Sequence, residues 1–263
     1  TSPTRFVTEG KRPFGLGAGR VRHRSGTRSV CHQELGLSGI TEHRFVASKS
    51  SGEVSAILTR PIHATALYVF GHGAGAGMSH VFMESASKLL ADRGIATFRY
   101  NFPHMEAGRR PPNTRPILLK TVRSAVAEAA VLAPDLPLLA GGKSMGGRMT
   151  SLAASMEPLD GVVGLAFFGF PLHASGGDSA ERGEHLSAVA LPMLFMQGTR
   201  DKLANLNLLE PLLQQVVPAP TLHIEDGADH GFHVLKRSGR TDEEVLMSLG
   251  ATLAAWAAGV AGP

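Results

Sequence analysis

Short apolar runs and longer segments with helical periodicity alternate along most of the chain. Short runs bounded by turn residues predict strands, and apolar positions that repeat every three to four residues predict helices. Strands are expected at 42–47, 53–61, 64–70, 95–100, 137–140, 162–168, 191–197 and 221–225. Helices are expected at 80–93, 117–133, 144–156, 203–217 and 242–258. This alternation predicts an α/β fold, with a doubly wound, mainly parallel sheet and helices on both faces.

Two features refine this picture at the start of the fold. The first two strands are separated only by Lys49-Ser-Ser-Gly52, so they are expected to pair as a hairpin. The run 64–70 is apolar throughout, which is typical of a strand covered on both faces.

Residues 1–40 are dominated by Gly, Arg, Ser and Thr and show no periodicity. We therefore predict a basic, disordered leader over 1–40 and one folded domain over 41–263.

The basic pI of about 9.5 raises the question of a nucleic-acid partner. Residues 1–40 hold seven basic and two acidic residues, a net +5, so a total of +4 leaves −1 for the rest of the chain. No pattern of aromatic residues for stacking accompanies the basic segment, which favours a flexible leader over an RNA-binding arm. We therefore expect no nucleic-acid partner. We also expect no membrane partner, because the chain lacks an apolar run that could span a bilayer. A single cysteine, Cys31, excludes an intramolecular disulfide, and a cytoplasmic location is expected.

The most informative motif is G-x-S-x-G, filled by residues 142–146 between a predicted strand and a predicted helix. In such a turn the serine hydroxyl projects above the sheet, and glycines on either side avoid collisions with neighbouring backbone. Ser144 is thus the candidate nucleophile. The same segment resembles the end of a phosphate-binding loop, but Pro137 stands where that loop needs a glycine. An ordinary Gly-rich turn is the alternative for the pentapeptide alone.

A second glycine-rich segment, 71–77, follows the strand at 64–70. It matches a dinucleotide-binding fingerprint, but the acidic residue expected about 20 positions later is missing. A loop that approaches a substrate oxygen explains the glycines as well. The backbone N–H groups of Ala74 and Met145 are therefore predicted to form an oxyanion hole.

A serine nucleophile needs a base and an acid, and both are expected in loops after later strands. Asp201 follows the strand at 191–197, and His230 follows the last strand, so the chain order is serine, acid, histidine. Asp201 could instead cap the next helix. His233 is a rival for the base, and Asp229 is interpreted as a turn residue.

With these motifs the chain resembles the α/β-hydrolase superfamily. Within that superfamily it is similar to the group that contains dienelactone-hydrolase-like proteins and the testis-expressed and nonspecific-lethal-complex relatives. The resemblance covers about residues 42–258. It rests on Gly71-His-Gly-Ala-Gly-Ala-Gly, Arg99-Tyr-Asn-Phe-Pro-His-Met-Glu-Ala-Gly-Arg-Arg-Pro-Pro, Gly142-Lys-Ser-Met-Gly-Gly-Arg, Gly169-Phe-Pro-Leu-His, Gln197-Gly-Thr-Arg-Asp and Asp229-His-Gly-Phe. It implies a triad of Ser144, Asp201 and His230 that cleaves carboxylic esters without a cofactor. Some eukaryotic relatives serve as complex subunits, so a non-catalytic scaffold is the alternative.

Loop lengths and side chains suggest what surrounds the serine. Only some twenty residues separate the strands at 162–168 and 191–197, where lids commonly enter this fold, so a minimal lid and a small-molecule ester substrate are expected. His72, His104 and His173 are candidate substrate-binding residues. Arg109 and Arg110 could attract an anionic substrate, although solvated surface charge is the favoured interpretation. The irregular spacing of the histidines argues against a metal site.

Overall fold

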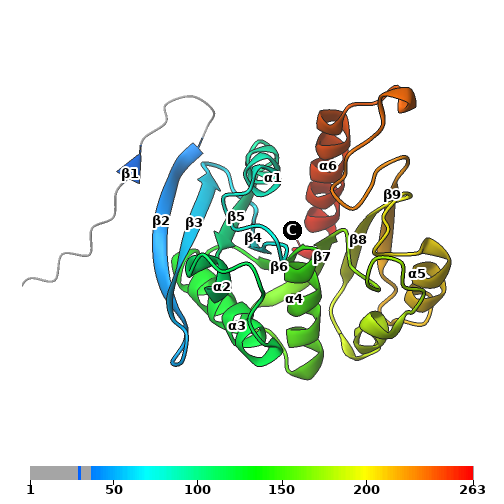
Figure 1. Ribbon diagram of the computed structural model, residues 1–263. Helices are drawn as coiled ribbons and strands as arrows, with labels where there is room; N and C mark the ends of the chain where they lie inside the picture. The colour runs from blue at the N-terminus through cyan, green and yellow to red at the C-terminus, as the bar shows by residue number, and fades with distance from the viewer. Residues whose placement is uncertain (1–28, 31–36, 263) are drawn as a thin grey trace, which may run out of the picture.

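The computed structural model describes residues 29–30 and 37–262, and Figure 1 shows their arrangement. Within this part, nine strands form one sheet in the order β1-β2-β3-β5-β4-β6-β7-β8-β9. The strands are β1 (Ser29–Val30), β2 (Leu37–Ser48), β3 (Gly52–Pro61), β4 (Ala66–Gly71), β5 (Ile95–Tyr100), β6 (Leu138–Lys143), β7 (Val162–Phe168), β8 (Met193–Gly198) and β9 (Thr221–Glu225). The predicted doubly wound α/β fold is confirmed.

The sheet has an antiparallel edge and a parallel body. The hairpin of β2 and β3 pairs antiparallel, as predicted, and β3 pairs antiparallel with β5. From β5 through β4, β6, β7 and β8 to β9 every pairing is parallel. The carboxyl ends of these parallel strands therefore lie along one edge, where the loops after β4, β6, β8 and β9 meet.

Helices cover both faces of the sheet (Figure 1). They are α1 (Val81–Ala91), α2 (Pro103–Glu106), α3 (Arg115–Leu132), α4 (Met145–Met156), α5 (Leu206–Leu213) and α6 (Asp242–Val260), with short 3-10 segments η1 (Glu181–Ala188) and η2 (Lys236–Ser238). Helices α1 and α6 pack on the face that carries Tyr68 and Phe70 of β4. Helices α3, α4 and α5 pack on the face that carries Leu67 and Val69. The apolar run at 64–70 thus reflects a strand buried on both sides.

Several boundaries differ from the predicted ones. Strand β2 begins at Leu37, and β1 lies at Ser29–Val30, so these parts of the predicted leader belong to the sheet; the remaining residues before Leu37 lie outside the described part. The hairpin pairing with β3 continues from Thr41 back to Leu37, which pairs with Pro61, so strand pairing overrides weak local propensity here. Helix α5 is shorter than predicted, because Asn205 caps it and the chain leaves the helix after Leu213. The short elements α2 and η1 were not predicted.

None of the described helices combines the length and the apolar character that crossing a bilayer requires.

Glu106 connects the antiparallel edge of the sheet to the loop after β4. Its carboxylate accepts hydrogen bonds from the Ser55 N–H and hydroxyl, from the Asn101 amide and from the Arg44 guanidinium. The oxygen of the Asn101 side chain in turn accepts the N–H of Met78, beside the glycine-rich segment 71–77. One carboxylate therefore holds β2, β3 and the loop after β5 together.

Replacing Glu106 by alanine should lower the free energy of unfolding by about 2–3 kcal/mol, because it leaves several donors without their charged acceptor. Glu157→Ala is the matched control. Glu157 also pairs with an arginine, but its side chain is 74% exposed, against 22% for Glu106. An exposed pair contributes only about 0–1 kcal/mol. Urea denaturation of both variants measures the difference, and equal losses would contradict the assigned role.

Candidate functional site

The turn between β6 and α4 places Ser144 at the carboxyl edge of the parallel strands. Ser144 has φ 51° and ψ −115°, an uncommon conformation for a residue with a side chain. A Cβ at Gly142 or at Gly146 would lie 2.3 Å from the carbonyl oxygen of Gly71. The turn therefore approaches the end of β4 so closely that both positions require glycine. This is the steric reason for the glycines of the G-x-S-x-G motif.

The structure brings Ser144, His230 and Asp201 together. The Nε2 atom of His230 lies 2.9 Å from the Ser144 hydroxyl oxygen, and its Nδ1 atom lies 2.8 Å from Oδ2 of Asp201. The Asp201 side chain is fully buried, whereas that of His230 is 26% exposed. With Nδ1–H donating to the carboxylate, Nε2 is free to accept the proton of the hydroxyl. The three side chains thus form a continuous hydrogen-bonded chain, with the carboxylate at its buried end and a partly exposed imidazole beside the serine.

Asp201 does not cap the next helix, the alternative considered for it, but it does bind its own loop. Its Oδ1 atom accepts the N–H of Leu203, while Oδ2 faces His230. The cap of α5 is Asn205, not Asp201. One carboxylate therefore orders its own loop with one oxygen and the histidine with the other.

Gln197 at the end of β8 is a site residue that the sequence reasoning missed. It is fully buried, and its amide nitrogen donates to Oδ2 of Asp201 and to the carbonyl of Phe170, while its oxygen accepts the N–H of Phe170. This amide and the imidazole of His230 thus contact the same carboxylate oxygen, and the amide helps to fix its position. The signal in the sequence was a glutamine at the end of an otherwise apolar strand.

The loop between β9 and α6 carries His230 and is closed by its own hydrogen bonds. Asp229 accepts the N–H groups of Gly231 and His233 through its side chain, which confirms its interpretation as a turn residue. An isolated bridge pairs Ala228 with Val234 across the loop. The loop therefore has defined geometry around the imidazole.

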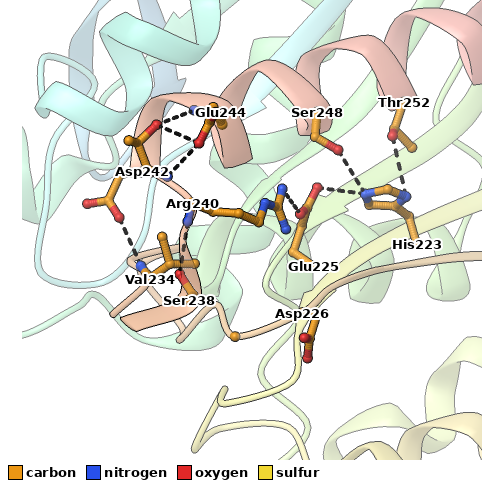
Figure 2. A network of polar contacts seen from close by, with 12 residues as sticks. His223, Glu225, Asp226, Val234, Ser238, Arg240, Asp242, Glu244, Ser248 and Thr252 are labelled. Atoms are coloured by element: carbon orange, nitrogen blue, oxygen red, sulfur yellow. Dashed lines mark hydrogen bonds and ion pairs between the residues drawn. The ribbon is translucent and has the colours of Figure 1, made fainter. Parts of the chain in front are cut away.

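A buried polar network anchors the two ends of this loop (Figure 2). Glu225, at the end of β9, accepts from Arg240 at 2.8 Å and lies 2.8 Å from Nε2 of His223. Burial works to raise the pKa of Glu225, but the hydrogen bonds from Ser248, His223 and Arg240 hold it below its usual value. Arg240 lies just before α6, so the ion pair ties the start of the loop to its end.

His233, the rival base, points away from the serine. Its Nδ1 atom lies 2.6 Å from Oδ2 of Asp242 at the start of α6, and its side chain is 63% exposed. The hydrogen bond to Asp242 and the charge of that carboxylate raise the pKa of His233. The imidazole that meets Ser144 is that of His230.

The three histidines predicted to contact substrate lie inside the rim rather than on its surface. His72 is buried, with Nδ1 2.7 Å from the Gly73 carbonyl and Nε2 accepting the N–H of Phe102. His173 is buried as well, and its Nε2 atom accepts the N–H of Asn205. His104 is fully buried and packs against the ring of His72. These rings connect loops, and the hydrogen bonds of His72 and His173 to the backbone occupy the nitrogens that a ligand would need.

The two predicted oxyanion donors lie on the segments that flank the serine. Met145 is the first residue of α4, so its N–H is among those that the helix leaves without a partner inside the helix. A Cβ at Gly73 would lie 3.7 Å from Cβ of Ser144, which places the residue before Ala74 directly against the nucleophile. The oxyanion hole remains a prediction.

Two arginines of the loop after β5 were considered for attracting an anionic substrate. Arg109 and Arg110 are exposed, as expected for solvated surface charge. Among the described residues, no group of three or more His, Cys, Asp or Glu side chains is arranged to hold a metal ion.

Comparison with known proteins agrees with this architecture. A family model described as an alpha/beta hydrolase domain matches residues 64–258. The structure is similar to a dienelactone hydrolase from Anabaena variabilis, with a TM-score of 0.66, 19% identity, and coverage of 85% of this chain and 99% of that one. A serine hydrolase homologue from Coxiella burnetii matches with a TM-score of 0.64 and 18% identity, and the match covers 80% of this chain and 97% of that one. A serine hydrolase without lid from Xanthomonas campestris matches with a TM-score of 0.62 and 18% identity, and the match covers 89% of this chain and 96% of that one.

The burial of His72 predicts acid sensitivity. Desolvation lowers the pKa of His72 to about 4, below the value of about 6.5 expected in the unfolded chain. The unfolded state therefore binds the proton more readily, so the contribution of neutral His72 to stability is complete above pH 6.5 and is lost as the pH falls toward 4. Between pH 7 and pH 5 this loss amounts to about 2 kcal/mol.

His72→Asn removes the titrating group and should reduce the drop in unfolding free energy between pH 7 and pH 5 by about 2 kcal/mol. Urea denaturation of both proteins at the two pH values measures it. If the unfolding free energy of wild type and of the variant depends on pH in the same way, His72 is not the source of the acid sensitivity.

Proposed function

The chain belongs to the α/β-hydrolase family, and from this membership we propose that it is a serine hydrolase that cleaves carboxylic esters through an acyl-serine intermediate. The observation that carries the proposal is the relay from the Ser144 hydroxyl through His230 to the buried carboxylate of Asp201. A serine hydroxyl is a weak nucleophile unless a base removes its proton, and this geometry supplies the base and its orienting acid.

The proposed reaction follows from these contacts. The Ser144 oxygen attacks the ester carbonyl while His230 takes its proton, and the Asp201 carboxylate stabilises the resulting imidazolium. The N–H groups of Ala74 and Met145 receive the oxyanion of the tetrahedral intermediate. His230 then donates the proton to the departing alcohol. Water, activated by the same histidine, releases the acid and restores the serine.

An open site favours small or solvent-accessible acyl groups. The chain between β7 and β8 holds only the short element η1. His230 keeps part of its ring exposed without a covering helix, which suits a substrate that approaches from solvent. A similar structure, that of the Xanthomonas campestris protein, is described as lacking a lid.

Labelling with a fluorophosphonate probe tests the nucleophile. Wild type should be labelled and Ser144→Ala should not, because the probe forms its bond with an activated serine oxygen. Turnover of short p-nitrophenyl esters should disappear in the same variant. Equal labelling of the two proteins would overturn the mechanism, and a wild type that neither reacts with the probe nor turns over an ester panel would favour a non-catalytic scaffold.

The two loop histidines provide a matched pair for testing the base. His230→Gln should lower kcat/KM for p-nitrophenyl acetate by about 10²-fold to 10⁴-fold, because general base catalysis is lost. His233→Gln should stay within about twofold, because surface substitutions away from the site have small effects. A larger loss in His233→Gln than in His230→Gln would reassign the base.

A further inference from the structure

Lys143, the residue just before the nucleophile, makes a contact that the triad does not explain. Its Nζ atom donates a hydrogen bond to the backbone carbonyl of His230 at 2.5 Å. The bond joins the last residue of β6 to the loop after β9, 87 positions later in the chain. The residue beside the nucleophile is thus bonded to the main chain of the proposed base.

The surroundings of this ammonium are aromatic and tightly packed. Nζ lies 5.7 Å from the ring centroid of Phe82 in α1 and 5.2 Å from that of Phe232 in the base loop. A Cβ at Gly169 would lie 3.0 Å from Nζ and 3.4 Å from Nδ1 of His230. The ammonium therefore occupies the space directly beneath the imidazole, where solvent has little access.

Enclosing a charge in this way is costly, so the position needs an explanation. Burial lowers the pKa of Lys143 to about 8, although the carboxylates of Asp201 and Asp229 favour the charged form. A methionine of similar length would fill the same space without a desolvation cost. What it would lack is the hydrogen bond to the carbonyl of His230.

The base loop has a conformation that needs external support. Phe232 adopts φ 65°, which is unfavourable for a bulky residue. Its ring stacks on Phe82 at 5.9 Å with an interplanar angle of 17° and contacts the edge of Phe168. Lys143 binds the loop two residues earlier, at His230, so the ring and the ammonium restrain the loop from both sides of Gly231.

We propose that Lys143 is a positioning residue, which holds the imidazole of His230 in line with Ser144 by fixing the carbonyl of the same residue. The proposal rests on the proposed function. The carbonyl carbon is bonded to Cα of His230, so a displacement of this part of the main chain would carry Cα and the imidazole with it and move Nε2 away from the hydroxyl. A misplacement of about 1 Å is sufficient to cost about 10²-fold in rate.

The test compares second-order rate constants for fluorophosphonate labelling in the full chain. Lys143→Met keeps the length and the packing against the rings but removes the donor, and it should react about 10-fold to 100-fold more slowly than wild type. Lys88→Met, an exposed lysine of α1, is the matched control and should react at the wild-type rate. Circular dichroism and the thermal midpoint verify that both variants are folded.

Chemical rescue separates an ammonium that positions the base from a side chain that only fills space. Lys143→Ala lacks the three carbons and the nitrogen beyond Cβ, which n-propylammonium supplies. Added n-propylammonium should restore the labelling rate at least fivefold, whereas ethyl methyl sulfide, of similar size but without a hydrogen-bond donor, should not.

The outcomes distinguish this inference from the proposed function. A wild type that is not labelled contradicts the proposed function itself. If wild type is labelled, equal rates in wild type and Lys143→Met overturn the role of Lys143. Equal rescue by the amine and the sulfide, or rescue by neither in a folded Lys143→Ala, would also overturn it. If Lys143→Ala does not fold, the rate of Lys143→Met decides alone.

Discussion

The close approach of two backbone segments, the end of β4 and the turn after β6, determines the rest of the site. The carbonyl of Gly71 occupies the space that a side chain at Gly142 or Gly146 would need. Because the segments touch, the glycine-rich loop after β4 passes directly beside Ser144, and the first N–H groups of α4 face the same point. One steric constraint therefore places the nucleophile and both candidate oxyanion donors together.

The base and the acid are positioned differently, by polar contacts between loops. Asp201 is held by the amide of Gln197, and the loop of His230 is anchored by the ion pair between the buried Glu225 and the partly exposed Arg240. The pair adds little net stability, because desolvation of the carboxylate offsets part of the attraction. Contacts of this kind fix the path of the loop that carries His230.

The sequence predicted the parts of this site that depend on local chain geometry. Ser144, Asp201 and His230 each stand at a turn after an apolar strand, and turn residues and apolar runs are readable one segment at a time. The contacts of Gln197 and Lys143 could not be predicted, because each joins segments that only the folded sheet brings together. His72 was predicted to contact substrate but is buried. A histidine in a loop gives no sign in the sequence of which backbone group its ring will meet.

The charges around His230 act on different parts of the residue. Asp201 contacts the ring itself at 2.8 Å, and in the proposed reaction its carboxylate stabilises the imidazolium. Lys143 has the opposite charge, but its ammonium binds the carbonyl, and two aromatic rings lie beside it. The carboxylate therefore contacts the ring, and the ammonium contacts the main chain of the same residue. The proposed positioning role of Lys143 thus needs no contact between the ammonium and the imidazole ring.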